Sequence, residues 1–153
     1  MIKVNVEVNN KSWHKKIKNP KKYLNIRLKK ILKIVKFFKN KNITFTILLT
    51  NSTYMKKLNK KFRNKNKSTD VLSFPFIPFD ILKFAKKKSL YIGDIAISYE
   101  IINFRSKKSN FNVEFNKVRI HGLLHLIGYN HIRNKDYFIM SKMEKKIFYS
   151  INQ

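Results

Sequence analysis

Four stretches of the chain carry the apolar patterns of β-strands. Apolar side chains fill every second position of residues 2–8, which predicts a strand with one buried face. Runs rich in β-branched and aromatic residues predict three more strands, at 43–50, 70–76 and 90–98. Because Pro75 cannot donate a ladder hydrogen bond, the third of these strands is expected to end there or to lie at an edge of the sheet.

Apolar residues at helical spacing predict helices in most of the remaining segments. The first follows Pro20, which suits the first turn of a helix, and runs over about 21–39 with its lysines mostly opposite the apolar stripe. Such a helix can lie on a membrane surface, but packing against a sheet is the commoner arrangement and is expected here. Asn51 or Ser52 can cap a short helix that ends near Arg63, and further helices are predicted at about 99–107, 113–128 and 134–150.

The order of these elements is strand, helix, strand, helix, two strands and then helices, with an irregular, lysine-rich stretch at 77–89. This order predicts an α+β fold with about four strands in one mixed sheet and helices mainly on one face. The length of 153 residues suits one hydrophobic core. Residues 1–153 are therefore expected to form a single domain.

The chain is strongly basic, with 35 Lys and Arg against 8 Asp and Glu and a net charge of +27. A polyanionic partner, RNA or DNA, is one explanation of this excess. The other is compositional, because lysine, asparagine, isoleucine and phenylalanine are all encoded by A/T-rich codons. Under either explanation the charge attracts nucleic acid strongly at low salt and much less at high salt.

Several classes of protein are excluded or disfavoured by what the chain lacks. No stretch approaches the roughly 20 uncharged apolar residues that a membrane span requires. The N-terminal MIKVNVEVNN lacks the apolar run and cleavage site of a signal peptide. The absence of cysteine excludes disulfides, thiolate ligands and cysteine nucleophiles. We therefore expect a soluble cytoplasmic protein with no membrane partner.

The segment HGLLHLIGYNH holds three of the four histidines. His121 and His125 lie one turn apart on the same face of the predicted helix. Gly128 can end that helix in a left-handed conformation, and the turn can then bring His131 back toward the other two. Three neutral imidazoles leave an open position on a divalent ion, which is the arrangement of a catalytic zinc site with water as the fourth ligand. Nickel, copper or iron would also accept these ligands.

The spacing of the three histidines matches the zinc-binding pattern of the metzincin proteases. Those enzymes carry Glu after the first histidine as a general base, whereas this chain has Gly122, which cannot transfer a proton. The only acidic residue within or close after the motif is Asp136. Peptide hydrolysis by that mechanism is therefore disfavoured. The remaining histidine, His14, stands alone in a predicted basic loop and is expected to be solvated.

Phosphodiester cleavage suits a site that keeps the metal and lacks the base. The metal can polarise a phosphoryl oxygen, and a positioned arginine can stabilise the developing negative charge. Arg63 is a candidate, because it ends a short predicted helix in a chain that otherwise uses lysine, and a guanidinium can grip phosphate in two places. The alternative is that Arg63 is an ordinary surface arginine without a role in catalysis, and its position alone does not exclude this.

Three blocks of the sequence together resemble the YbeY-type bacterial endoribonucleases, also called rRNA maturation factors. HGLLHLIGYNH resembles the family signature H-G-x-L-H-L-x-G-Y-D-H, LNKKFRNKNKSTDVLSFPF resembles the segment before and into a central strand, and LYIGDIAIS resembles a later strand. The blocks follow one another in the family's order over about 44–131, and the length of the chain also fits.

The resemblance implies a metal-dependent, single-strand-specific endoribonuclease that acts in rRNA maturation, near the 3′ end of 16S rRNA, and in ribosome quality control. It implies zinc at His121, His125 and His131, and a role in activity for Arg63. RNA and ribosomal particles are the implied partners, with no specificity for DNA. The family's fold, a four-stranded sheet with several helices, agrees with the elements predicted above.

The chain departs visibly from the family signature at Asn130, where the family has Asp. A carboxylate there could hydrogen-bond to a histidine ligand and strengthen it, and Asn lacks the charge. This departure motivates an alternative function, a non-catalytic, zinc-containing factor that binds RNA on the ribosome. Asp94 is expected to cap the backbone at a bend, with a role beside the metal or substrate as the other possibility. Thr69, Asp70 and Ser73 are candidates to organise the loop after Arg63.

Overall fold

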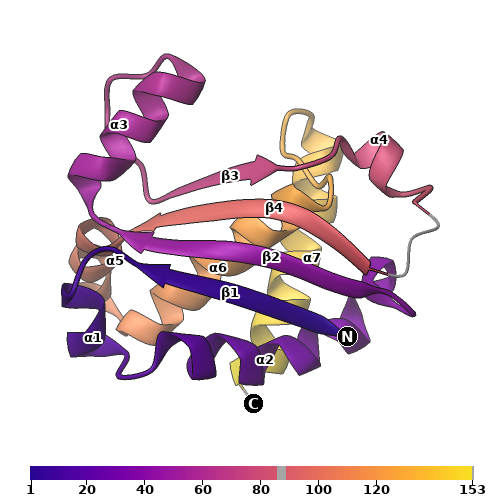
Figure 1. Cartoon of the computed structure of the whole chain (residues 1–153), viewed down its shortest axis with the longest axis horizontal. Coiled ribbons are helices and arrows are strands. Elements are labelled where there is room, and N and C mark those ends of the chain that lie inside the picture. The colour runs from indigo at the N-terminus through magenta and orange to yellow at the C-terminus, as the bar shows by residue number, and fades with distance from the viewer. Residues whose placement is uncertain (86–88, 153) are drawn as a thin grey trace.

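Four strands form one mixed sheet in the computed structural model, which describes residues 1–85 and 89–152 (Figure 1). The sheet order is β1-β2-β4-β3; the first three strands run parallel, and β3 pairs antiparallel with β4. The predicted α+β fold with a four-stranded mixed sheet is therefore confirmed. The strands are β1 (Ile2–Val8), β2 (Asn42–Thr50), β3 (Val71–Pro75) and β4 (Ser89–Ser98).

β3 is an edge strand and ends at Pro75, as the missing N–H of proline predicted. The irregular stretch predicted at 77–89 contains one short helix. Residues 86–88 of that stretch, the side chain of Leu32 and residue 153 lie outside the described part of the chain.

Seven α-helices lie within the described residues, five of them close to the predicted ranges. The helix predicted over 21–39 is shorter than expected, because Val35 has extended backbone and only a 3-10 turn follows at Lys36–Phe38. His14 is exposed as expected, but it lies on a short helix and not in a loop. The helices are α1 (Ser12–Lys16), α2 (Pro20–Ile34), α3 (Ser52–Arg63), α4 (Phe79–Leu82), α5 (Tyr99–Arg105), α6 (Phe111–Leu126) and α7 (Asn134–Asn152).

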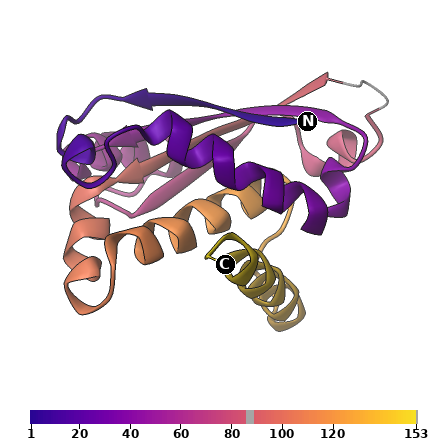
Figure 2. The same ribbon diagram turned by 90° about the horizontal axis from the view of Figure 1, so that it is seen from below.

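The helices cover mainly one face of the sheet, where α2, α6 and α7 lie together (Figure 2). The apolar stripe of α2 is buried against this face, which confirms packing on the sheet for the basic amphipathic helix. Within the described residues, no helix has the length and apolar character to span a membrane. On the opposite face, Met55 of α3 forms a small cluster with Leu72 and Ala96.

α6 runs directly under β3 and β4, and Gly122 permits this close approach. A Cβ atom added at Gly122 would lie 2.9 Å from Cγ2 of Ile95, 3.1 Å from Cγ2 of Val71 and 3.2 Å from Oγ of Ser73. The Ser73 hydroxyl also donates a 3.0 Å hydrogen bond to the Gly122 carbonyl. A side chain at position 122 would therefore point into the sheet. Gly122, which in the sequence counted against a protease base, therefore also has a packing role.

Replacing Gly122 by alanine is expected to lower the free energy of unfolding by about 1–2 kcal/mol. Alanine favours a helix by up to about 1 kcal/mol over glycine, but the rigid β-branched groups of Ile95 and Val71 leave no room for the methyl group. Denaturant unfolding of the two proteins measures the difference. Equal or greater stability of the variant would show that the helix–sheet contact relaxes freely.

Candidate metal centre

The last turns of α6 carry two histidines, His121 and His125. The chain turns sharply directly after this helix. The N–H of Gly128 donates to the carbonyl of His125, and the N–H of Tyr129 donates to the carbonyl of Leu124. These two bonds form a Schellman motif, which places the residue after the helix in the left-handed region, and Gly128 has φ +89° there. The prediction that Gly128 ends this helix is confirmed, although α6 lies about two residues earlier than predicted.

The turn brings all three histidines of the motif together. A ring nitrogen from each of His121, His125 and His131 can be chosen so that all lie within 4.8 Å of one another. The ring centroids are 4.5 Å apart for the first two and 5.4 and 5.1 Å from each to His131. His121 and His125 are half-buried and His131 is exposed, so the cluster opens toward solvent. This is the only such cluster within the described residues.

The hydrogen bonds of two histidines fix where their protons lie. Nδ1 of His125 is 2.9 Å from the carbonyl oxygen of Tyr129, which can only accept, so Nδ1 carries the proton. Nδ1 of His121 is 2.7 Å from a carboxylate oxygen of Glu144 and also donates. In each neutral ring, Nε2 is then left with a lone pair.

The two Nε2 atoms of His121 and His125 face each other at 3.0 Å. With both protons on Nδ1, two lone pairs converge on one point, an arrangement that a cation between them stabilises. Two nitrogens bound to one tetrahedral zinc at about 2.0–2.1 Å lie about 3.3 Å apart. The donor set therefore fits a divalent ion, with His131 supplying the third nitrogen.

The electrostatic environment keeps His125 neutral. Burial, together with the nearby His121, His131 and Arg63, lowers the pKa of His125 to about 4, against an opposing hydrogen bond to the Tyr129 carbonyl. Above that pH the imidazole has no proton to lose before it binds a metal, so protons compete little for this ligand.

The depressed pKa of His125 predicts an acid sensitivity of the metal-free protein. Between the ordinary pKa of 6.5 and about 4, the unfolded chain binds a proton at His125 that the folded chain does not. The free energy of unfolding should therefore fall as the pH falls through this window, and be insensitive to His125 above it. Denaturant unfolding of metal-free wild type and of His125→Asn at pH 7.5 and 5 measures the effect. An equal loss in both proteins would contradict it.

The charge of Arg63 is near enough to His125 to contribute to the lowered pKa of that histidine. It is the last residue of α3, and Asn64 ends the helix in the left-handed conformation with φ 55°. The exposed guanidinium lines a second cleft together with Lys65 and Lys67. The structure thus brings Arg63, predicted from a separate block of sequence, to the neighbourhood of the three histidines.

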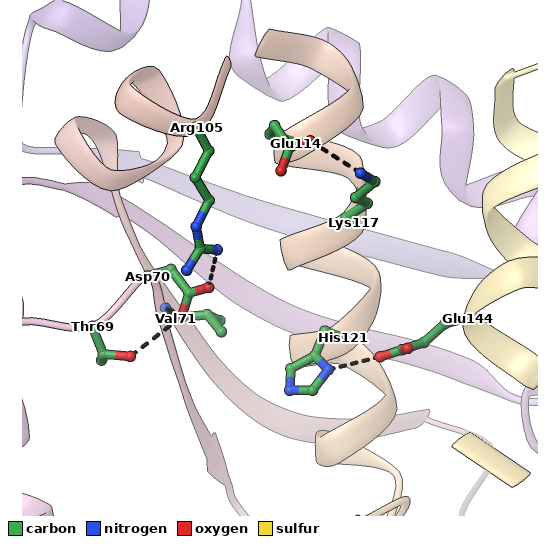
Figure 3. Close-up of polar contacts among 8 residues, drawn as sticks. All are labelled: Thr69, Asp70, Val71, Arg105, Glu114, Lys117, His121 and Glu144. Atoms are coloured by element: carbon green, nitrogen blue, oxygen red, sulfur yellow. Dashed lines mark hydrogen bonds and ion pairs between the residues drawn. The ribbon is translucent and has the colours of Figure 1, made fainter. Parts of the chain in front are cut away.

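Glu144 was missed by the sequence analysis. It reaches the ring of His121 from α7, 23 residues along the chain (Figure 3). A carboxylate that accepts from the second nitrogen of a histidine ligand fixes the ring and makes it a better donor. The one available signal is rarity, since the chain has only 8 acidic residues.

Asn130 does not make the hydrogen bond to a histidine that was considered for a carboxylate at this position. Its side-chain oxygen accepts from the N–H of Ile132 at 3.3 Å, so it supports the turn and not a histidine ring. Asp94 is not part of the histidine cluster: it accepts from the Tyr91 hydroxyl on the exposed face of β4, and it caps no backbone N–H among the described residues. Among the described residues, the carboxylate that hydrogen-bonds to the histidine cluster is that of Glu144.

The segment between α3 and β3 is held by Asp70, as considered from the sequence. Its carboxylate accepts from the Thr69 hydroxyl and the Val71 N–H and forms an ion pair with Arg105 of α5. These contacts tie the strand after Arg63 to the body of the protein (Figure 3). Ser73, also on β3, donates a hydrogen bond to the carbonyl of Gly122 on the histidine helix.

Comparison with known proteins agrees with this arrangement. The family model described as "Endoribonuclease YbeY" matches residues 7–152. A curated protein named endoribonuclease YbeY from Pelagibacter ubique is 50% identical over 97% of this chain and 95% of its own length. One of the same name from Buchnera aphidicola (subsp. Acyrthosiphon pisum) is 40% identical over 94% of this chain and 85% of its own.

A solved structure also shares the fold. The solution structure of TM1509 from Thermotoga maritima superposes with a TM-score of 0.62 and 26% sequence identity, covering 99% of this chain and 89% of the other. The family match covers nearly the whole chain and includes the histidine motif and Arg63. The chain therefore belongs to the YbeY family of endoribonucleases.

Proposed function

We propose that this chain is a zinc-dependent, single-strand-specific endoribonuclease of rRNA maturation, acting near the 3′ end of 16S rRNA and in ribosome quality control. In this proposal His121, His125 and His131 hold the metal, and Arg63 contacts the phosphate. The observation that carries it is the pair of Nε2 lone pairs that converge at 3.0 Å. Its partners are RNA and ribosomal particles, and its compartment is the cytoplasm.

In this proposal the metal, Arg63 and two lysines have different roles. A bound zinc ion supplies Lewis-acid activation of the phosphodiester. Arg63 is exposed, its charge acts on His125, and its guanidinium can donate two parallel hydrogen bonds to phosphate oxygens, where charge increases in the transition state. Lys65 and Lys67 line the same cleft and attract the backbone on either side.

Two alternatives have less support. The non-catalytic, zinc-containing RNA-binding factor was motivated by Asn130, but that side chain hydrogen-bonds to the backbone within the turn and not to a histidine ring. A metalloprotease would need a base at position 122, and a side chain there would point at Ile95 and Val71 of the sheet. The endoribonuclease names of the relatives also favour the nuclease.

Substrate discrimination tests this proposal. The purified, zinc-loaded protein is incubated with one RNA sequence as a single strand, with the same RNA annealed to its complement, and with the matching single-stranded DNA. We expect cleavage of the single-stranded RNA alone, lost on chelation and restored by zinc. Equal cleavage of all three, or full activity after the metal is removed, would refute it.

Replacing Glu144 by glutamine is expected to weaken zinc binding about 10- to 100-fold, the usual effect of removing a partner of a histidine ligand. Glutamine keeps an acceptor for Nδ1 of His121 but loses the negative charge. A competition titration with a chelator measures the zinc dissociation constant. Asp136→Asn is the matched control, because Asp136 lies on the same helix and pairs with Arg133. An unchanged constant for Glu144→Gln would remove Glu144 from the centre.

A further inference from the structure

A cavity of about 500 Å³ opens beside His121, on the side away from His125 and His131. It follows α6 back from His121 toward Glu114 and lies between that helix, α7, the end of α5 and the start of β3 (Figure 3). Pockets that bind small organic groups have volumes of roughly 300–1,000 Å³. The cavity is therefore large enough for a nucleobase with its sugar.

The charges that line this cavity differ from those of the rest of the molecule. Three of the chain's 8 acidic residues are here, Asp70, Glu114 and Glu144. Asp70 and Glu114 form ion pairs with Arg105 and Lys117, and the Glu144 carboxylate accepts a hydrogen bond from His121. The positive charge of the walls is thus largely neutralised, whereas phosphate binding requires free positive charge.

The polar groups that remain suit the edge of a base. Glu114, which lines the cavity, accepts from Lys117 and Ser109 through the same oxygen, Oε1, and its Oε2 has no hydrogen-bond partner among the described residues. Arg105 donates to Asp70 through one nitrogen of its five-donor fork. Exocyclic amines and ring carbonyls of bases need one acceptor and one donor of this kind.

The other walls of the cavity are apolar and aromatic. Val71 and Val118 lie on the strand and α6 sides, and α7 contributes Phe148 and the 66% exposed Tyr149. Flat apolar surfaces of this kind bind the faces of unstacked bases, with aromatic rings supplying stacking.

We propose that this cavity binds one unpaired base of the RNA strand, next to the phosphodiester held at the three histidines. The inference rests on the proposed function and adds a site for the base. The second cleft, with Arg63, Lys65 and Lys67, shares Asp70, Val71 and Arg105 with the cavity, so backbone and base would occupy adjoining sites.

This base site explains why the substrate must be single-stranded. A base in a duplex is paired and stacked, and it would have to leave the helix to enter a cavity between α6 and α7. That step costs a few kcal/mol in a duplex and very little in a flexible single strand. The cavity thus selects single strands without any contact to a second strand.

A binding measurement tests the base site without using cleavage. Metal-free protein is titrated with a fluorescent RNA tetranucleotide and with its abasic counterpart, which has the same phosphates and sugars. We expect the base-bearing strand to bind about tenfold more tightly, since stacking of one base contributes roughly 1–3 kcal/mol. Ser141→Phe, which fills the cavity from α7, should bring the two affinities together.

A matched pair of tyrosines on α7 supplies the second variant and its control. Tyr149→Ala removes an exposed wall of the cavity and should reduce the ratio of the two affinities, while Tyr137→Ala, 57% exposed and outside the cavity, should preserve it. Equal binding of the two strands by wild type, or an unchanged ratio in both Ser141→Phe and Tyr149→Ala, would overturn the base site. Failure of the proposed nuclease function would appear separately, as absence of RNA cleavage by the zinc-loaded protein.

Discussion

Alanine in place of His125 is expected to abolish stoichiometric zinc binding and to lower RNA cleavage by about 10³-fold, because a bound metal contributes several kcal/mol to transition-state stabilisation. His125 is the central histidine of the cluster. Its Nε2 faces that of His121, and its Nδ1 proton is committed to the Tyr129 carbonyl. Without the His125 side chain only two imidazoles remain. His121 lies on α6 and His131 lies after it, so the two cannot enclose an ion.

The chain provides its own control for this experiment in His14. That histidine is exposed on α1 and distant in sequence from the cluster, so His14→Ala should leave both zinc content and cleavage unchanged. Zinc is measured by elemental analysis and cleavage by initial rates on a single-stranded RNA. Full activity of His125→Ala in a protein that still binds one zinc would exclude His125 from the centre.

Alanine in place of Arg63 is expected to lower the cleavage rate by about 10²- to 10³-fold without loss of zinc, the usual effect of removing one donor to a developing charge. Arg63→Lys should recover only part of the rate, because an ammonium restores the charge but not the two parallel hydrogen bonds.

Lys60→Ala separates this role from general electrostatics. It removes one positive charge from the last turn of the same helix, and Lys60 does not line the cleft of Arg63. Its effect should be small and should decrease with added salt. If Lys60→Ala and Arg63→Ala lower the rate equally, Arg63 contributes only to the overall positive potential.

The strands and long helices could be predicted because burial imposes a period on the sequence. The alternation in residues 2–8 matches β1, and Pro75 correctly predicted where β3 ends. α1 and α4 were missed, since helices of 5 and 4 residues are too short to show a period. α1 is held instead by Trp13, fully buried against Tyr99 and Phe111, a contact between distant segments.

The histidine cluster could be predicted because its three histidines lie close together along the chain. Its supporting contacts could not, for two different physical reasons. Glu144 meets His121 only where α7 packs on α6, and the acceptor for His125 is a backbone carbonyl that no side chain reveals. The sequence correctly indicated that Gly122 cannot be a base, but the close packing that requires glycine there depends on which strands α6 crosses.

The most direct test of the metal centre is a zinc titration of the metal-free protein, with bound zinc and the rate of RNA cleavage measured on the same samples. His121, His125 and His131 form one site, so the rate should rise in proportion to bound zinc and stop rising at one equivalent. Cleavage at the full rate before zinc is added, or a rate that does not follow occupancy of this site, would contradict the metal centre.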